Sequence, residues 1–207
     1  MFLALNSGGI DSPVAAYSVL KKKYELDFIY FKTDAESKEK TLKTVQKFSE
    51  TFKKKFKLYS IDHASILNEF LEKSGKWDRK FICIFCKRMM YRISAEISEK
   101  YGYIALITGE NIGQVASQTL QNLYVLEQSV NIPILRPLLC MDKQEIIDTA
   151  KKIGTYEISV KKSIKCQYVP KYPAINTNLE RILKIEEKID MKKMIEASLK
   201  NLEVNII

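Results

Sequence analysis

Short apolar runs alternate along the chain with longer segments in which apolar residues recur every three or four positions. The short runs predict β-strands at Met1–Leu5, 26–33, Phe56–Ile61, Ile104–Ile107 and Pro133–Arg136. The run at 26–33 is too continuous for a half-exposed strand, so we expect it to be buried on both faces. Strands that alternate with helices predict an α/β fold, with a doubly wound, mainly parallel sheet covered on both sides.

The segments between the strands have the periodicity of amphipathic helices. Helices are expected at Pro13–Lys23, around the stripe Leu42, Val45, Phe48, Phe52 and Phe56, and through Ile66–Leu71. A longer helix follows the break at Gly75–Lys80, and its apolar seam begins with Cys83 and Cys86. Asp142 and Glu145 form a capping box for a later helix, which Gly154 ends.

The last part of the chain predicts a small C-terminal helical extension. Its apolar positions indicate a helical pair that either covers the core or forms a homodimer interface; they are Leu179, Ile182, Leu183, Ile189, Met194, Ile195 and Leu199. Before it, the irregular segment Lys161–Ile175 contains Cys166 and two prolines, and such loops often carry function. We therefore expect a catalytic domain at residues 1–175 and an extension of the same domain at 176–207.

Candidate chemistry begins with Ser7-Gly8-Gly9-Ile10-Asp11-Ser12, which joins the first strand to the first helix. A Gly-rich turn that feeds a helix start presents free backbone N–H groups and the positive end of a helix dipole, which suits a phosphate. The spacings of the ordinary P-loop and of the dinucleotide fingerprint are both absent. The alternative is a tight turn that needs two glycines for positive φ.

Residues 101–142 contain no lysine, although the chain has 34 Lys and Arg residues in 207. We expect this segment to be buried or to line a site. Within it we predict a helix whose polar face carries Gln114, Ser117, Gln118 and Gln121. Such amides and hydroxyls suit hydrogen bonding to a base or ribose, and the alternative is a helix packed against a partner subunit.

Net charge and targeting signals limit the function classes. The formal net charge of +9 makes a nucleic acid or nucleotide a plausible partner, although lysine-rich faces also serve solubility. No apolar run reaches 18 residues and the N-terminus lacks a basic region before its strand. We expect no membrane segment and no signal peptide, and therefore a cytoplasmic protein.

The four cysteines suggest metal or redox chemistry rather than a disulfide scaffold, because no export signal is present. Cys83 and Cys86 form a C-x-x-C at a helix start, where the dipole favours thiolates and both sulfurs reach one metal; small core residues are the alternative. The single histidine, His63, is interpreted as a hydrogen-bonded turn residue without a catalytic role.

Arginines are rare in this chain, yet Arg88 and Arg92 share one helix stripe with Glu96. A solvated ion-pair ladder explains this spacing, at a few tenths of a kcal/mol per pair. The planar guanidinium also suits phosphate, which leaves a binding role open.

Together these segments resemble the catalytic domain of tRNA 4-thiouridine synthetases, sulfurtransferases also linked to thiamine biosynthesis. The similarity runs in order from residue 1 to about 175. It is carried by the strings SGGIDSPVA (7–15), CKRMMYR (86–92), TGENIGQVASQTL (108–120), RPL (136–138), MDK (141–143) and IGTYEIS (153–159). The resemblance implies a Rossmann-like ATP pyrophosphatase fold, with the site at the carboxyl ends of the parallel strands.

The resemblance also implies a mechanism. ATP adenylates uridine O4 in tRNA and a sulfur nucleophile then displaces AMP, which leaves 4-thiouridine. Pyrophosphate is expected on Ser7, Gly8, Gly9 and Ser12, with Asp11 acting on Mg²⁺. AMP is expected to contact the remaining matched positions, which are Ala4, Leu5, Tyr30, Phe31, Arg92, Gly109 and Gln118.

By the same resemblance, Cys166 matches the catalytic cysteine, which takes a persulfide in some members. In members with C-x-x-C, Cys83, Cys86 and Cys166 resemble an iron–sulfur site that leaves one iron open. Cys140 is interpreted as a core residue. The sulfur donor is expected to be sulfide or a donor protein.

Members of this family normally carry an N-terminal RNA-binding region, which we expect to be absent here, so that tRNA binding would come from a separate protein or from the basic helices. Two other readings stay open. One is an enzyme of the same superfamily that thiolates or amidates a small molecule, and the other is a non-catalytic nucleotide- or metal-binding partner subunit.

Overall fold

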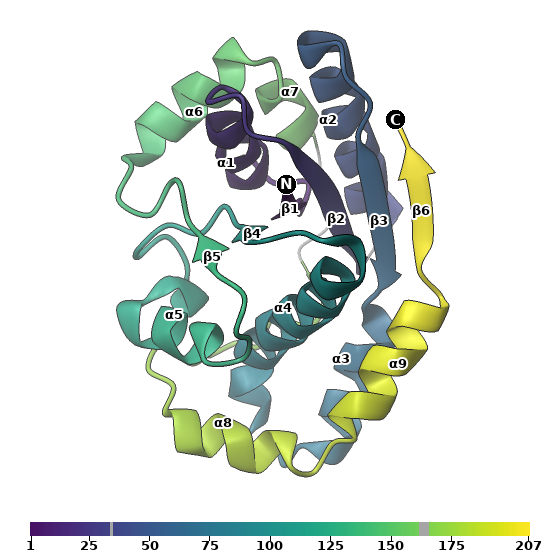
Figure 1. Cartoon of the computed structure of the whole chain (residues 1–207). Coiled ribbons are helices and arrows are strands. Elements are labelled where there is room, and N and C mark those ends of the chain that lie inside the picture. Colours follow the sequence, from purple (N-terminus) through teal and green to yellow (C-terminus); the bar gives the residue numbers. More distant parts are fainter. Residues whose placement is uncertain (34, 162–165) are drawn as a thin grey trace.

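The computed structural model describes residues 1–33, 35–161 and 166–207. In these residues the strands form one six-stranded sheet in the order β5-β4-β1-β2-β3-β6 (Figure 1). The first five strands are parallel and β6 runs antiparallel to β3. The strands are β1 (Phe2–Leu5), β2 (Leu26–Lys32), β3 (Lys57–Asp62), β4 (Leu106–Ile107), β5 (Ile134–Leu135) and β6 (Glu203–Ile206). The predicted mainly parallel, doubly wound sheet is confirmed.

The helices follow the predicted order, with one exception described below. They are α1 (Asp11–Leu20), α2 (Ala35–Phe52), α3 (Ala64–Lys73), α4 (Ile82–Tyr101), α5 (Leu120–Glu127), α6 (Lys143–Lys152), α7 (Tyr156–Ser159), α8 (Leu179–Glu186) and α9 (Met191–Lys200), with short 3₁₀ turns η1 (Arg79–Phe81) and η2 (Ala116–Gln118). The capping box at Asp142 and Glu145 is present as predicted. No helix in the described ranges combines the length and apolar character needed to cross a membrane.

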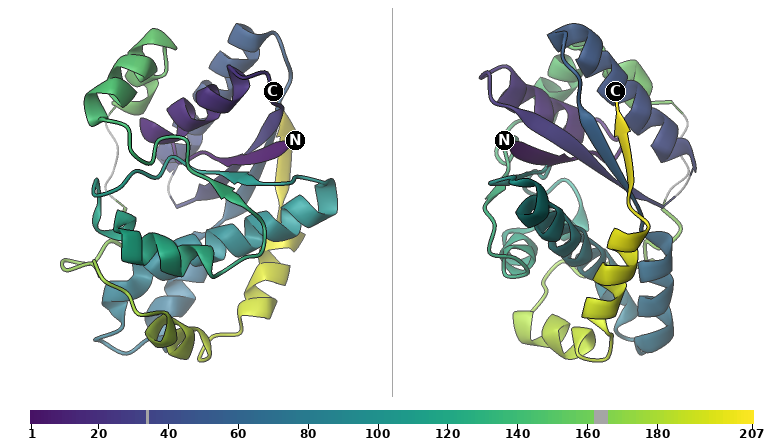
Figure 2. Two further views of the ribbon diagram at one scale, coloured as in Figure 1. Left: turned by 60° about the vertical axis from the view of Figure 1, so that its left-hand side comes forward. Right: turned by 45° about the vertical axis from the view of Figure 1, so that its right-hand side comes forward.

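Two groups of helices cover the two faces of the sheet (Figure 2). Side chains alternate along β2: Phe28 and Tyr30 pack with α1, α2 and α6, whereas Ile29 and Phe31 pack with α3 and α4. Almost the whole strand is buried for this reason. The expectation that residues 26–33 are covered on both faces is confirmed for β2.

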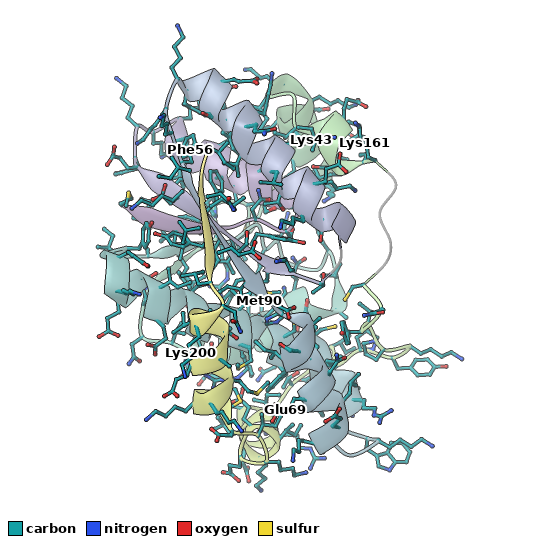
Figure 3. The ribbon with its side chains drawn as sticks, turned by 90° about the vertical axis from the view of Figure 1, so that its right-hand side faces the viewer. Lys43, Phe56, Glu69, Met90, Lys161 and Lys200 are labelled. Carbon is teal, nitrogen blue, oxygen red and sulfur yellow. The ribbon has the colours of Figure 1, made fainter. Side chains whose placement is uncertain are left out.

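The C-terminal segment adds more than the predicted helical pair. Ile182, Ile185, Ile189 and Met194 lie in the same core cluster as α4, so this pair covers the core. After α9 the chain forms β6, a strand that the sequence pattern did not predict. Figure 3 shows β6 along β3, with Phe56 beside its end, and Phe56 exchanges two backbone hydrogen bonds with Ile207 at 2.8 and 2.9 Å.

The predicted helix with Gln114, Ser117, Gln118 and Gln121 on one face is wrong. Gly113 has a positive φ of 76°, and Val115 and Thr119 are both extended, so no helix runs through this segment. Thr119 instead caps α5 by accepting a hydrogen bond from the Asn122 N–H at 3.2 Å. Only Gln121 of the four lies on a regular α-helix, and the others lie in turns that face the site.

A buried ion cluster fixes α8 to α4. The Arg88 guanidinium is fully buried and contacts Glu186 through Nε at 2.7 Å and Nη2 at 3.0 Å. Arg92 donates to the same carboxylate at 2.9 and 2.7 Å. Burial opposes ionisation of Glu186, but the two arginines outweigh it and lower its pKa. The stripe of arginines is therefore part of the core of the fold.

Replacing Glu186 with Ala should destabilise the protein by about 3–5 kcal/mol, because the buried Arg88 guanidinium would lose its counter-ion. Chemical denaturation at pH 7 measures this change. Glu180→Ala is the matched control, because Glu180 pairs with Lys184 on the exposed side of the same helix and its loss should leave the stability nearly unchanged. Equal effects of the two substitutions would contradict the assigned role of the cluster.

Candidate functional site

The Gly-rich turn between β1 and α1 is organised by the buried side chain of Asn6. Asn6 Oδ1 accepts hydrogen bonds from the Gly8 N–H at 3.2 Å and from the Ser12 hydroxyl at 3.1 Å. Ser12 Oγ in turn accepts the Ser7 N–H at 3.1 Å. Gly8 has a φ of +72°, which a glycine adopts without strain. The turn is thus preformed, with α1 starting directly after it.

The turn lies where the strand order reverses. The chain leaves β1 toward β2 on one side and β4 lies on the other, so the loops after β1 and β4 face each other. This is the position at which open α/β sheets bind ligands. The loops approach very closely here: a Cβ placed on Gly109 would lie 2.6 Å from the Ser12 nitrogen and 2.8 Å from the Asp11 carbonyl carbon.

A pocket of about 280 Å³ opens between these loops. It is lined by Leu5, Ser7, Gly9, Asp11, Ser12, Lys87, Met90, Tyr91, Thr108, Gly109, Glu110, Val115, Ser117 and Gln118. Seven of the residues predicted from the sequence lie in this wall, namely Leu5, Ser7, Gly9, Asp11, Ser12, Gly109 and Gln118. The pocket therefore joins the phosphate loop to the lysine-free segment.

The other predicted nucleotide contacts lie outside this wall. Tyr30 and Phe31 point into opposite core clusters, and Ala4 is also buried. The Gly8 backbone belongs to the turn but does not line the pocket. Both terminal nitrogens of Arg92 contact Glu186. A role of these residues in nucleotide binding stays a prediction.

Lys143 and Glu110 are two of the charged groups at the site that were not singled out from the sequence. Lys143, at the start of α6, donates from Nζ to Asp11 Oδ1 at 2.6 Å and to Gln114 Oε1 at 2.9 Å. Glu110, which follows Gly109, is 5% exposed and forms the centre of a polar cluster. Both residues fall within the strings MDK and TGEN, so their motif membership was the available signal.

Four side chains donate hydrogen bonds to the Glu110 carboxylate. Lys87 reaches Oε1 at 2.9 Å, and Tyr91, Arg136 and Thr108 reach Oε2 at 2.7, 2.8 and 3.3 Å. Burial opposes ionisation of Glu110, but the neighbouring cations and the Tyr91 hydroxyl lower its pKa to about 2. Burial, reinforced by the nearby Glu110 charge, raises the pKa of Tyr91. Glu110 is therefore a fixed anion in the pocket wall at neutral pH.

The pocket has the donor set that a nucleotide with Mg²⁺ requires. Gln118 Oε1 is buried and has no hydrogen-bond partner within the described part of the chain, so it is free to accept from a ligand amine. The Asp11 carboxylate at the first turn of α1 suits a hard cation such as Mg²⁺. The loop supplies hydroxyls and a helix start for phosphate oxygens.

The cysteines lie at the start of α4 and in the segment beyond residue 165. Cys83 and Cys86 are half-buried and Cys166 is exposed. Burial raises the pKa of Cys83 and the Cys166 thiol raises it further, while Lys87 acts in the opposite direction. Burial raises the pKa of Cys86 as well. Burial is the largest effect on both thiols, and stabilisation of thiolates by the helix start stays a prediction.

His63 proves to be a neighbour of this group. Its Nε2 lies 3.3 Å from Cys86 Sγ, and burial lowers the pKa of His63 to about 4, which keeps the ring neutral. Among the residues that the structure describes, no three His, Cys, Asp or Glu side chains are arranged to hold a metal ion. The thiols present do not form a ready ligand set, and the iron–sulfur cluster stays a prediction.

Two further predictions concern Cys140 and the irregular segment Lys161–Ile175. Cys140 is exposed, so its interpretation as a core residue is wrong; it ends the turn after Leu138, whose side chain is the buried one. The predicted loop at Lys161–Ile175 is described from Cys166 onward, and residues 162–165 lie outside the described ranges. Beyond Cys166, the Ala174 carbonyl accepts from Asn122 Nδ2 at 2.9 Å, which holds this segment against α5.

Comparisons with known proteins agree on one family. The sequence profile described as Thiamine biosynthesis protein (ThiI) matches residues 1–191. A probable tRNA sulfurtransferase of Caldanaerobacter subterraneus subsp. tengcongensis is 42% identical over 198 residues, which cover 93% of this chain and 51% of the relative. The chain thus spans about half the length of the curated relatives it matches.

Solved structures give the same picture. A 4-thiouridine synthetase in complex with RNA and bound ATP superposes with a TM-score of 0.91 at 33% identity, covering 99% of this chain and 55% of that one. The U34-tRNA thiolase NcsA of Methanococcus maripaludis, with its [4Fe-4S] cluster, gives a TM-score of 0.52 at 17% identity over 98% of this chain and 73% of that one. The second likeness bears on the fold alone.

Replacing Gly109 with Ala should weaken ATP binding by about tenfold or more. The added Cβ would clash with the backbone of the first turn of α1 and push the two loops apart, and such overpacking costs about 1–3 kcal/mol. Equilibrium dialysis with labelled ATP measures the change. Gly75→Ala is the control, since its Cβ would meet nothing closer than 3.7 Å. Unchanged affinity in the Gly109 variant would contradict the close approach.

Proposed function

Because this chain belongs to the Thiamine biosynthesis protein (ThiI) family, we propose that it catalyses ATP-dependent transfer of sulfur to uridine in tRNA, forming 4-thiouridine. The observation that carries the proposal is the pocket at the reversal of strand order, which joins a phosphate loop to a polar wall that includes Lys87, the residue after Cys86. The solved structure of the 4-thiouridine synthetase that this chain resembles contains RNA and a bound ATP. ATP and tRNA are accordingly the substrates that we propose here.

The first step is adenylation of the uridine. O4 attacks the α-phosphorus of ATP, the bond to the β-phosphate oxygen breaks, pyrophosphate leaves with the electron pair, and the N3 proton is lost to solvent. Ser7, Gly9 and Ser12 would bind the departing pyrophosphate, with the helix start of α1 behind them. Mg²⁺, when bound by Asp11, would neutralise phosphate charge.

Lys143 is a further candidate for binding the pyrophosphate. Its ammonium lies 2.6 Å from Asp11 and comes from the N-terminus of α6, so it is held at the mouth of the phosphate loop. We propose that it contacts the same pyrophosphate as the loop does. Gln118, whose Oε1 lacks a described partner, would accept a hydrogen bond from the adenine amine.

The second step replaces AMP by sulfur. A sulfur nucleophile attacks C4 of the adenylated uridine, the C4–O4 bond breaks, and AMP leaves with the electron pair. We propose that Cys166 delivers this sulfur as a persulfide, whose outer sulfur it takes from a persulfide of a donor protein while the donor's thiol is released. The outer sulfur attacks C4, and a second thiol, for which Cys83 is the candidate, then attacks Cys166 Sγ, which releases 4-thiouridine and leaves a disulfide that an added thiol reduces. Sulfide, if it is the donor, would attack C4 directly. The Cys166 thiol is exposed and close enough to Cys83 to raise the pKa of that thiol, which supports a shared task.

As an alternative, we propose that these cysteines hold an iron–sulfur cluster, to which no reaction step is assigned. NcsA carries a [4Fe-4S] cluster on a similar fold, but the thiols described here do not form a ready ligand set. Iron and acid-labile sulfide in anaerobically purified protein, compared with Cys83→Ala and Cys86→Ala, decide the question.

The domain limits are also proposals. We propose that residues 1–175 form the catalytic unit and that 176–207 extend the same domain. This is supported by Glu186, which is the counter-ion of Arg88, and by β6, which pairs with β3. The net charge of +9 supports a polyanionic substrate, bound directly or through a separate RNA-binding protein.

Purified protein supplied with ATP, Mg²⁺, unmodified tRNA, a persulfide-bearing sulfur donor and a thiol reductant should form 4-thiouridine, with AMP and pyrophosphate released in equal amounts. Nucleoside mass spectrometry and a pyrophosphate assay measure the products. Asp11→Asn should lower the rate by about 100-fold or more, since it removes a metal-binding charge at the reacting phosphates. ATP binding without any turnover would favour a partner subunit, and turnover only with a small acceptor would favour the small-molecule enzyme.

Cys166→Ala should separate the two steps. We expect the variant to release pyrophosphate in the presence of tRNA at a rate within about threefold of the unchanged protein, because the phosphate site is intact, while 4-thiouridine is lost. Cys140→Ala, at another exposed cysteine, is the control and should keep both activities. Undiminished thiolation by the Cys166 variant would remove this residue from the mechanism.

A further inference from the structure

Lys87 lies at the site, and neither the matched motifs nor the family match assigns it a role. It follows Cys86 on the first turns of α4, and its side chain reaches into the nucleotide pocket. Its ammonium lies 2.9 Å from Glu110 Oε1, with the side chain 24% exposed. Of the described residues that line the pocket, Lys87 is the one with a cationic side chain.

The ammonium is held from one side and open on the other. Tyr91, Arg136 and Thr108 donate to Glu110 Oε2, so this oxygen is occupied by other groups. Oε1 accepts from Lys87. An ionised carboxylate fixed by three other donors therefore anchors the lysine. Its other N–H groups have no hydrogen-bond partner among the described residues and can meet a ligand in the pocket. Such an arrangement needs little reorganisation when charge develops nearby.

Lys87 also lies close to the cysteines. It directly follows Cys86 and shares the first turns of α4 with Cys83. If sulfur is transferred here, the uridine C4, whose O4 is adenylated before sulfur replaces it, would lie between the phosphate loop and these thiols, near Lys87.

The residues that would contact the phosphates of ATP come from two different parts of the pocket wall. The turn of Ser7, Gly9 and Ser12 faces the pocket from β1 and α1, where the pyrophosphate is expected. Lys87 comes from α4, together with Met90 and Tyr91. If the pyrophosphate lies on the turn, the α-phosphate next to it, at which the bond is broken, would lie in the pocket that Lys87 lines.

We infer that Lys87 is a catalytic residue whose ammonium contacts the α-phosphate of ATP, and that Glu110 is the positioning residue that holds it there. In adenylation the O4–phosphorus bond forms while the bond from the α-phosphorus to the pyrophosphate oxygen breaks. Negative charge on the non-bridging α-phosphate oxygens is then met by Lys87. This inference rests on the proposed function.

The test compares Lys87→Met, Lys87→Arg and Glu110→Gln in tRNA-dependent pyrophosphate release, alongside the dissociation constant of ATP measured without tRNA. For Lys87→Met we expect kcat to fall by about 100-fold or more while the ATP dissociation constant changes by under about threefold. Lys87→Arg keeps a cation and should recover at least about tenfold of that loss. Lys100→Met, at the exposed far end of the same helix, is the matched control and should be unchanged.

The role of Glu110 is tested by combining the substitutions. If Glu110 acts through Lys87, the double variant Lys87→Met/Glu110→Gln should turn over no more slowly than Lys87→Met alone. Multiplying defects in the double variant would overturn the positioning role. Thermal unfolding and the ATP dissociation constant show for each variant that the fold and the phosphate site are kept.

Two results would overturn the role of Lys87. The first is a rate within about threefold of the unchanged protein for Lys87→Met. The second is a loss of rate matched by an equal loss of ATP affinity, which indicates ground-state binding alone. Absence of any tRNA-dependent pyrophosphate release by the unchanged protein would instead refute the proposed function, so the two failures are distinguishable.

Discussion

The contact between Gly109 and the backbone of Ser12 is the constraint on which the site depends. It brings the loop after β4 against the first turn of α1, at a distance that leaves no room for a Cβ. The phosphate loop and the polar wall of the pocket are therefore positioned by one backbone contact rather than by side chains. Because β1 and β4 are parallel neighbours, the contact forms at their carboxyl ends, where helix starts supply positive potential.

Two buried carboxylates organise the charges behind this contact. Glu186 neutralises Arg88 and holds Arg92, which joins α8 to α4. Glu110 gathers Lys87, Tyr91 and Arg136 within the pocket wall. In both cases a helix or loop far along the chain supplies the partner of a cation on α4. A buried charge is stable only when it is paired with an opposite charge. Because α4 carries both Arg88 and Lys87, this helix links the stability of the fold to the electrostatics of the site.

Much of the architecture was predictable because the buried face of a helix or strand requires apolar residues at regular intervals in the sequence. The continuous apolar run of β2 follows from its coverage on both faces, and the capping box at Asp142 follows from local hydrogen bonding. The segment around Gln114 and Gln118 was predicted wrongly for the same reason. Polar residues spaced like a helix face also occur in turns, and Gly113 and Thr119 decided the local backbone.

The sequence by itself determined most of the alternating strands and helices up to the C-terminal segment, the phosphate loop and the family, since each depends on neighbouring residues or on a contiguous motif. Only the tertiary structure decided which groups meet. The approach of Lys143 to Asp11 spans 132 positions and that of Arg88 to Glu186 spans 98. The same holds for His63 beside Cys86, for Lys87 on Glu110 and for β6 on β3. Such pairs depend on how the elements pack, and local periodicity carries no information about that distance.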